Sequence, residues 1–415
     1  MSEMTNGAVP EGASRRMEET RSDTRRRPGG RPVTIGLVVS GIVAVCGIVL
    51  WVMQLSGGLV QTGMRNLDSW GLYITLFMFL VGLSAGGLII SSVPKALGLT
   101  GFGGIAKVAV WTSICCTVLA IVFVVVDMGH PGRLWELLVF ANMGSPLMWD
   151  VIVLCTYLVL SVGYLWAMGR VESGRMKPAV LRVVSVVALV VAVLVHSVTA
   201  WIFGLQAGRE MWHTAILAPW FVSSALVCGT ALVLVTVLAL RHTGYLVPEE
   251  GCIERLAKML GAFVCVDLYF FGCDLLNEGY PGGAGASLVE TITAGPLAPF
   301  FWTELIGCAL CAVVCFVPRL RTVPLLSTAS VLAMAAIFCK RVILLVGGFQ
   351  APNLGQPTPL NEMSITYWEN GMEAAYQGLV YWPSPLEFGV AAGVVGLGMF
   401  LFLLGIRFLP LRPRS

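Results

Sequence analysis

Hydrogen-bonding and aromatic side chains follow one another over three helical turns of an apolar segment. They are His196, Thr199, Trp201, Phe203 and Gln206. A quinone ring requires flat side chains to stack on, donors for its two carbonyl oxygens, and a group that exchanges a proton near neutral pH. The segment therefore predicts a quinone site in which His196 bonds a quinone oxygen. A lone buried histidine with a purely structural hydrogen bond is the alternative.

Further ionisable residues lie inside segments apolar enough to cross a membrane. A charge at that depth costs about 2.5–3.5 kcal/mol or more, and such residues usually mark a pathway or a ligand site. We expect most of them near one face of the membrane, with Asp267 closest to the middle. The set comprises Asp127, Asp150, His196, Asp267, Asp274, Glu304, Lys340, Arg341 and Glu387.

These charged residues allow more than one interpretation. Asp127, Asp150, Glu304 and Glu387 stand at the ends of apolar segments and could be ordinary interfacial carboxylates. Lys340, Arg341 and Asp267 lie deeper, so they should pair with carboxylates, because an unpaired buried charge is costly. We expect a buried charge network of Asp267, Glu304, Lys340 and Arg341. A structural ion pair between helix bundles is the alternative for the deeper residues.

Histidine and cysteine positions argue against resident metal groups. A haem held by two histidines needs a pair of facing imidazoles, but only His196 of the four histidines lies inside an apolar segment. Cys308, Cys311 and Cys315 share one helix face within an unbroken apolar run, which favours packing over an iron–sulfur cluster. We therefore expect no haem, no iron–sulfur cluster of the chain's own, and no other metal site.

The elements that position these residues are apolar helices. The 415 residues are 57% hydrophobic and 12% charged, with a mean hydropathy of +0.84, and this excludes a soluble globule. We predict an all-α integral membrane protein of about ten spans between residues 33 and 409, flanked by a disordered basic tail, 1–32, and a short tail, 410–415. The spans are expected near 33–55, 70–93, 105–127, 146–168, 179–204, 216–240, 255–275, 298–318, 323–347 and 386–408.

Basic residues are distributed very unevenly between the two sides of these spans. Twenty-one lysines and arginines fall in the two tails and the turns of one side, while only Arg65, Arg133 and Arg209 fall on the other. The excess of positive charge marks the cytoplasmic side. We therefore predict a multi-pass protein of the cytoplasmic (inner) membrane with both termini in the cytoplasm. The longest outer loops, 276–297 and 348–385, are predicted to cap the bundle or to dock a partner.

Two small-residue stripes hint at an internal repeat. One runs from Phe79 to Gly86 and the other from Phe221 to Gly229, four helices later. Such stripes let helices approach closely. Two related four-helix bundles plus peripheral helices would fit this spacing.

Four stretches together resemble the NrfD/PsrC family, the membrane subunits of polysulfide-reductase-type complexes. The resemblance covers about residues 35–410, and the ten spans are most similar to the long, HybB-like branch. The first stretch is Trp70-Gly-Leu-Tyr73 leading into Phe79 to Gly87, and the second is Asp127 to Arg133 with Asn142 to Asp150. The third is His196 to Arg209 with Trp212-His213 and Ala218 to Phe221, and the fourth is Tyr381 to Glu387.

The resemblance implies a haem-free membrane subunit that binds menaquinone or ubiquinone as a substrate. The quinone is expected near the extracytoplasmic surface of the cytoplasmic membrane. The resemblance also implies an extracytoplasmic, ferredoxin-like iron–sulfur partner and a catalytic subunit that is often a molybdopterin enzyme. The quinone pocket is then expected to be lined by Trp70, Tyr73, Trp201 and Gln206. His196 would bond the quinone, and Asp150 or Asp127 would carry the proton.

Two other functions remain open at this point. A secondary transporter could place a substrate between two bundles at Asp267 and Lys340. Gly- or Pro-broken helices at matching positions of the two halves, which such a transporter would show, are not evident. A purely structural membrane anchor, with electrons passing elsewhere, is the other alternative.

Overall fold

The computed structural model describes residues 30–64, 68–98, 101–102, 104–209, 211–282, 284–350 and 381–412. Within these ranges, ten helices are long and apolar enough to cross a membrane, which confirms the predicted number and the all-α class. Predictions for the tail 1–29, for residues 413–415 and for loop residues 351–380 lie outside the described residues. The ten are α2 (Arg31–Gly57), α3 (Leu72–Leu97), α4 (Ala106–Asp127), α6 (Pro146–Glu172), α7 (Pro178–Gly204), α8 (Leu217–His242), α9 (Cys252–Gly279), α11 (Ala298–Phe316), α12 (Val323–Val342) and α15 (Pro385–Phe408).

Proline begins many of these helices. Pro lacks the backbone N–H that a first turn leaves unpaired, and its fixed φ suits that position. In α15 the first turn is secured further: the Glu387 backbone N–H donates to the Ser384 hydroxyl, and the Glu387 carboxylate accepts from the Ser384 N–H. Proline occupies the first turn of α2, α6, α7, α11, α12 and α15.

Shorter elements connect the spans. The predicted loop 276–297 contains a helix, α10 (Ala284–Ala294), and α12 continues through one π-helical turn, η4 (Ile343–Gly347), into α13 (Gly348–Gln350). The other short elements are η1 (Leu59–Gln61), η2 (Pro131–Arg133), α5 (Glu136–Val139) and η3 (Pro318–Leu320).

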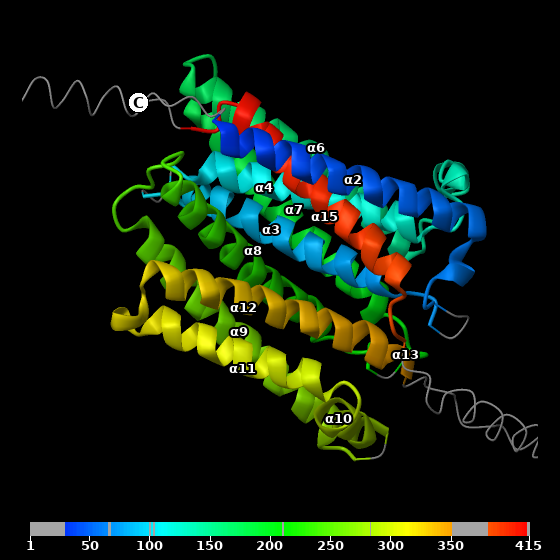
Figure 1. Cartoon of the computed structure of the whole chain (residues 1–415). Coiled ribbons are helices and arrows are strands. Elements are labelled where there is room, and N and C mark those ends of the chain that lie inside the picture. The colour runs from blue at the N-terminus through cyan, green and yellow to red at the C-terminus, as the bar shows by residue number, and fades with distance from the viewer. Residues whose placement is uncertain are drawn as a thin grey trace, which may run out of the picture.

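Contacts between the spans form two closed rings of four helices (Figure 1). In the first ring α3 contacts α4, α4 contacts α6, α6 contacts α7, and α7 returns to α3. In the second ring α8, α9, α11 and α12 meet in the same cyclic way. Helix α2 pairs with α15, and α15 packs on α4, outside the first ring. These contacts are consistent with two four-helix bundles plus peripheral helices.

The two rings meet along a seam at which α3 packs on α8. A methyl group at Gly86 would stand 2.5 Å from the Cα of Gly229 and 2.4 Å from the carbonyl oxygen of Ala225. Only glycine allows this backbone approach. The two small-residue stripes therefore face each other at the seam, where α7 also contacts α8 and α12 contacts α3.

The two ends of the bundle differ in charge. One end carries Trp70, the segment 128–145 and the connection that follows α7, with Arg133 and Arg209 as its described basic residues; we call it the arginine-poor end. The other carries the α6–α7 and α8–α9 connections, and we call it the arginine-rich end.

Candidate functional site

A cavity of about 300 Å³ opens at the arginine-poor end of the first ring. Its walls come from the segment before α3, from the connection that follows α7, and from α13. Two of the residues expected to bind quinone, Trp70 and Gln206, lie in these walls. The lining is completed by Ser69, Gly208, Arg209, Trp212 and Phe349.

Aromatic rings dominate the cavity. The rings of Trp70 and Trp212 are stacked, with centroids 6.5 Å apart and an interplanar angle of 28°. Phe349 meets Trp212 edge to face at 5.1 Å, and Phe203 does so at the same distance. The indole N–H of Trp212 donates to the Leu344 carbonyl, 2.7 Å away, so this ring is fixed in orientation. Such a cluster offers flat apolar surface to a planar ring.

Arg209 supplies the fixed positive charge of the cavity. Its guanidinium donates to the Phe349 carbonyl at 2.9 Å and lies 5.1 Å from the centroid of the Phe349 ring. Burial raises the pKa of the Asp68 carboxyl, outside the spans, above its ordinary value, and the charge of Arg209 acts in the opposite direction. The cavity thus combines apolar walls with a hydrogen-bonding cation and the Gln206 amide, the composition typical of small-molecule sites.

One face of α7 continues inward from the cavity. Phe203, Thr199 and His196 follow at spacings of four and three residues and share this face. The Thr199 hydroxyl donates to Oδ1 of Asp150 on α6 over 2.6 Å. His196 is 1% exposed, and within the described residues its Nδ1 has no hydrogen-bond partner. Asp150 and His196 therefore lie beneath the aromatic cavity, not in its walls.

Trp201 does not share this face. It is 38% exposed and points outward from the bundle. Trp201 follows His196 by five positions, which turns it by about 140° around the helix at 3.6 residues per turn. The structure thus separates Trp201 from the other residues expected to bind quinone, because the helix directs the two side chains to different faces.

Tyr73 and Asp127 form a separate group against α2. The Tyr73 hydroxyl donates to the Gln54 side-chain oxygen over 2.6 Å, and the Gln54 amide donates to the Val126 carbonyl at 3.4 Å. Asp127 ends α4, and its buried Oδ1 has no hydrogen-bond partner among the described residues. Neither side chain lines the cavity.

The second ring holds a buried ionic cluster. The Lys340 ammonium donates to Oδ2 of Asp267 at 2.5 Å and lies 3.3 Å from Oε1 of Glu304. The Ser223 hydroxyl donates to the other oxygen of Asp267 at 2.9 Å. Lys340 also lies 4.4 Å from the ring centroid of Trp220. All three charged side chains are at most 3% exposed.

Arg341 is buried without an ion pair to any described carboxylate. One of its terminal nitrogens donates to the Ser224 hydroxyl at 2.5 Å, and the guanidinium lies 3.7 Å from the ring centroid of Phe221. Its Nε has no hydrogen-bond partner among the described residues. Arg341 is thus held at the seam mainly by a hydroxyl and an aromatic face, a cation–π arrangement.

Several residues of these groups were not singled out from the sequence. Arg209, Trp212 and Phe349 line the cavity, and Gln54 binds Tyr73. Arg209 is one of only three basic residues counted on its side of the membrane, and Trp212 belongs to a quoted motif, so both carried a signal. Phe349 and Gln54 come from distant helices, and nothing local marks them.

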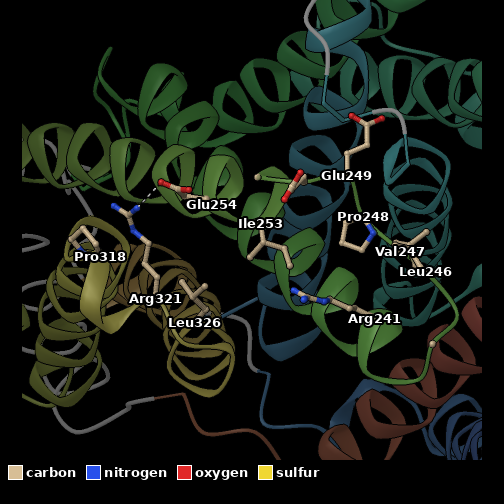
Figure 2. Close-up of a pocket in the computed structure, with 13 residues that line it drawn as sticks. Arg241, Leu246, Val247, Pro248, Glu249, Ile253, Glu254, Pro318, Arg321 and Leu326 are labelled. Atoms are coloured by element: carbon tan, nitrogen blue, oxygen red, sulfur yellow. Dashed lines mark hydrogen bonds and ion pairs between the residues drawn. The ribbon is translucent and has the colours of Figure 1, made fainter.

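A larger cleft, of about 680 Å³, opens at the arginine-rich end (Figure 2). It is bounded by the α8–α9 connection, the start of α9, η3 and α12, and it contains Arg241, Glu249 and Glu254. Arg321 pairs with Glu254 at its edge, 3.2 Å away. None of the residues predicted to bind quinone lies in it.

Cysteines on α11 pack inside the second ring. Cys308, Cys311 and Cys315 are fully buried, and the sulfur atoms of Cys311 and Cys315 are 4.0 Å apart. Among the described residues, no group of three or more histidine, cysteine, aspartate or glutamate side chains is arranged to hold a metal ion.

Comparison with known protein families identifies the chain. Residues 60–353 match the family model described as "Polysulphide reductase, NrfD". The chain belongs to the NrfD family. Its matched region includes both rings and the cavity at the arginine-poor end, and the chain is a multi-pass membrane protein.

Three relatives that cover most of this chain are named as subunits of reductases, two of them as membrane subunits. A putative membrane subunit of a dimethyl sulfoxide reductase from Halobacterium salinarum is 33% identical over 91% of each chain. A selenate reductase subunit from Mesobacillus selenatarsenatis is 24% identical over 90% of this chain and 93% of its own. The integral membrane subunit of a menaquinone reductase from Nitratidesulfovibrio vulgaris is 25% identical over 87% of each chain.

Proposed function

We propose that this NrfD protein is the haem-free membrane subunit of a respiratory oxidoreductase complex. It binds menaquinone or ubiquinone at the arginine-poor end of the first ring and exchanges electrons with an iron–sulfur partner. The observation that carries the proposal is the aromatic cavity lined by Trp70, Gln206 and Arg209, within the region matched by the family.

Each wall of the cavity has a role in this proposal. The quinone ring stacks against Trp70 or Trp212, whose planes already lie nearly parallel. Gln206 and Arg209 are within the lining and donate to the two carbonyl oxygens. Asp150 and His196 lie deeper than the cavity walls. Their proposed role is therefore to hold and move protons and not to bind the quinone ring.

Asp150 and His196 are the proposed proton carriers. Thr199 on α7 holds the Asp150 carboxylate by a 2.6 Å hydrogen bond. His196 stands about one turn from Thr199 on α7. A carboxylate and an imidazole positioned in this way can pass a proton stepwise away from a quinol hydroxyl. Asp127 with Tyr73 is a second proposed proton route, toward α2 and α15.

The arginine-poor end is the proposed extracytoplasmic face. Basic residues concentrate at the opposite end, which favours a cytoplasmic position for that end in the inner membrane. A ferredoxin-like iron–sulfur protein would then dock over the cavity and connect it to a catalytic, often molybdopterin, subunit. The names of the relatives, which are subunits of dimethyl sulfoxide and selenate reductases, support this assembly.

The transporter alternative finds less support in the geometry. Its expected substrate charges, Asp267 and Lys340, bind each other at 2.5 Å and are closed in by Glu304 and Trp220. None of the described cavities is lined by these residues.

Calorimetric titration of the purified complex with a water-soluble naphthoquinone tests the cavity. Trp70→Leu removes one stacking face, worth about 1 kcal/mol, and should raise Kd roughly fivefold. Asp150→Asn leaves the cavity walls intact, so Kd should stay unchanged while quinol-dependent turnover falls about 100-fold, the typical worth of a positioned proton carrier.

Trp166→Leu is the matched control, because Trp166 is a half-exposed tryptophan on the outward side of α6. It should alter neither Kd nor turnover. Unchanged Kd in Trp70→Leu together with unchanged turnover in Asp150→Asn would remove the basis of the proposal.

A further inference from the structure

Buried polar residues of the two rings lie at nearly the same depth. Counted along each helix from its arginine-poor end, with the α12 span counted through η4 to Gly347, Asp150, His196, Arg341 and Glu304 lie roughly 6 to 12 Å inward at 1.5 Å per residue. All four are at most 6% exposed. A single polar layer therefore crosses both rings beneath the cavity.

Equivalent helices of the two rings contribute equivalent residues to this layer. The third helix of each ring carries a carboxylate within its first two turns, Asp150 on α6 and Glu304 on α11. The fourth helix carries a polar residue about two turns from its end: His196 on α7, and Lys340 on α12 when that span is counted through η4 to Gly347. The first ring faces its carboxylate with a neutral hydroxyl, and the second faces it with an ammonium group.

His196 and Arg341 approach the seam from opposite rings. A methyl group at Gly82 of α3 would lie 3.7 Å from Nε2 of His196 and 3.1 Å from the sulfur of Cys228 on α8. Arg341 binds Ser224, which stands one turn before Cys228 on the same face of α8. Along α8, the two side chains are therefore separated by about one turn, roughly 6 Å.

His196 and Arg341 each keep one buried nitrogen without a partner in the described part of the chain. Nδ1 of His196 and Nε of Arg341 are buried and lack a hydrogen-bond partner among the described residues. Buried polar atoms without a protein partner are ordinarily satisfied by an internal water. A water between them would complete a polar connection across the seam.

We propose that this connection is a lateral proton relay, in which a proton released in the first ring is stored on Glu304 in the second. The relay rests on the proposed quinol chemistry at the cavity. It runs from Asp150 and Thr199 to His196, across the seam by water held at Arg341, and through Ser223 and Asp267 to the Lys340 cluster.

Atoms and electrons balance over one turnover. Oxidation of one quinol yields the quinone, two electrons and two protons; the electrons pass to the iron–sulfur partner, and one proton leaves by the cavity mouth. The other proton crosses the seam and forms the O–H bond of the Glu304 carboxyl group. Arg341 keeps its proton throughout and orients the water.

Glu304 is the terminal proton acceptor because its carboxylate receives fewer hydrogen bonds than that of Asp267. Asp267 accepts hydrogen bonds from both Lys340 and Ser223. Oε1 of Glu304 lies 3.3 Å from the ammonium but without hydrogen-bond geometry, and it has no other described donor. Protonation of Glu304 therefore sacrifices fewer contacts than protonation of Asp267.

Infrared difference spectroscopy of the intact complex tests the relay. Quinol oxidation should produce the carbonyl band of a newly protonated carboxyl group, which shifts in heavy water. Glu304→Gln should abolish this band, whereas Glu136→Gln, which alters a surface glutamate, should leave it. If Glu304→Gln does not assemble, Glu304→Asp should assemble and displace the band.

The relay is overturned if the carbonyl band persists in Glu304→Gln or keeps its position in Glu304→Asp. Normal quinol turnover in the same sample would leave the proposed function standing. Absence of both turnover and band in the wild-type complex overturns the quinol chemistry and the relay with it.

Discussion

Lys340 is placed between two buried carboxylates, and its pairing shows what the sequence could predict at the scale of single residues. Charges deep inside apolar segments had to find partners, and Lys340 does so with Asp267 and Glu304. The carboxylate partner expected for Arg341 is not found among the described residues. A serine and an aromatic face from α8 hold Arg341, and such long-range neighbours depend on how the two rings pack.

Replacement of Lys340 by methionine should strongly destabilise the protein. It leaves Asp267 and Glu304 buried without a counter-ion, which typically costs about 3–5 kcal/mol. Denaturant- or heat-induced unfolding in detergent measures the loss. The control is Lys258→Met, whose exposed pair with Glu254 on one helix is worth only about 0.3–0.5 kcal/mol. Equal stabilities of the two variants would show that the buried cluster contributes nothing.

At the scale of elements, hydropathy and charge predicted the helices well. The ten spans follow from apolar length, and six of them have a proline in the first turn, which the sequence shows directly. The helix α10 inside a predicted loop was missed, because its 11 residues are too short to register as a span. The direction in which each side chain leaves its helix was not considered. Trp201 was therefore grouped with His196, although the two side chains leave α7 on different faces.

The α3–α8 seam should tolerate no added methyl group. Gly86→Ala places its Cβ about 2.5 Å from the Gly229 backbone, and the helices must separate. Overpacking of this kind costs about 1–3 kcal/mol, so the variant should unfold at a lower temperature. Gly163→Ala on α6, where nothing lies within 4 Å of the new Cβ, serves as the control and should behave like the wild type. An unshifted Tm in Gly86→Ala would mean that the rings do not meet as described.

At the scale of the whole molecule, two independent asymmetries coincide. Basic residues gather at one end, while the aromatic cavity and the polar layer lie toward the other. The family resemblance could be stated from the motifs, but the site could be predicted only in part. Trp70 and Gln206 meet in one cavity. Tyr73, Asp127, Asp150 and His196 belong to neighbouring groups, because they stand on four different helices and contact different neighbours.

The position of a bound quinone analogue in the intact complex, determined by cryo-electron microscopy, tests the central claim most directly. We expect density for a planar ring stacked against Trp70 or Trp212, within reach of Gln206 and Arg209 and above Asp150 and His196. Density in the second ring, or at the arginine-rich end near Arg241, with this cavity filled only by water, would contradict the proposed quinone site.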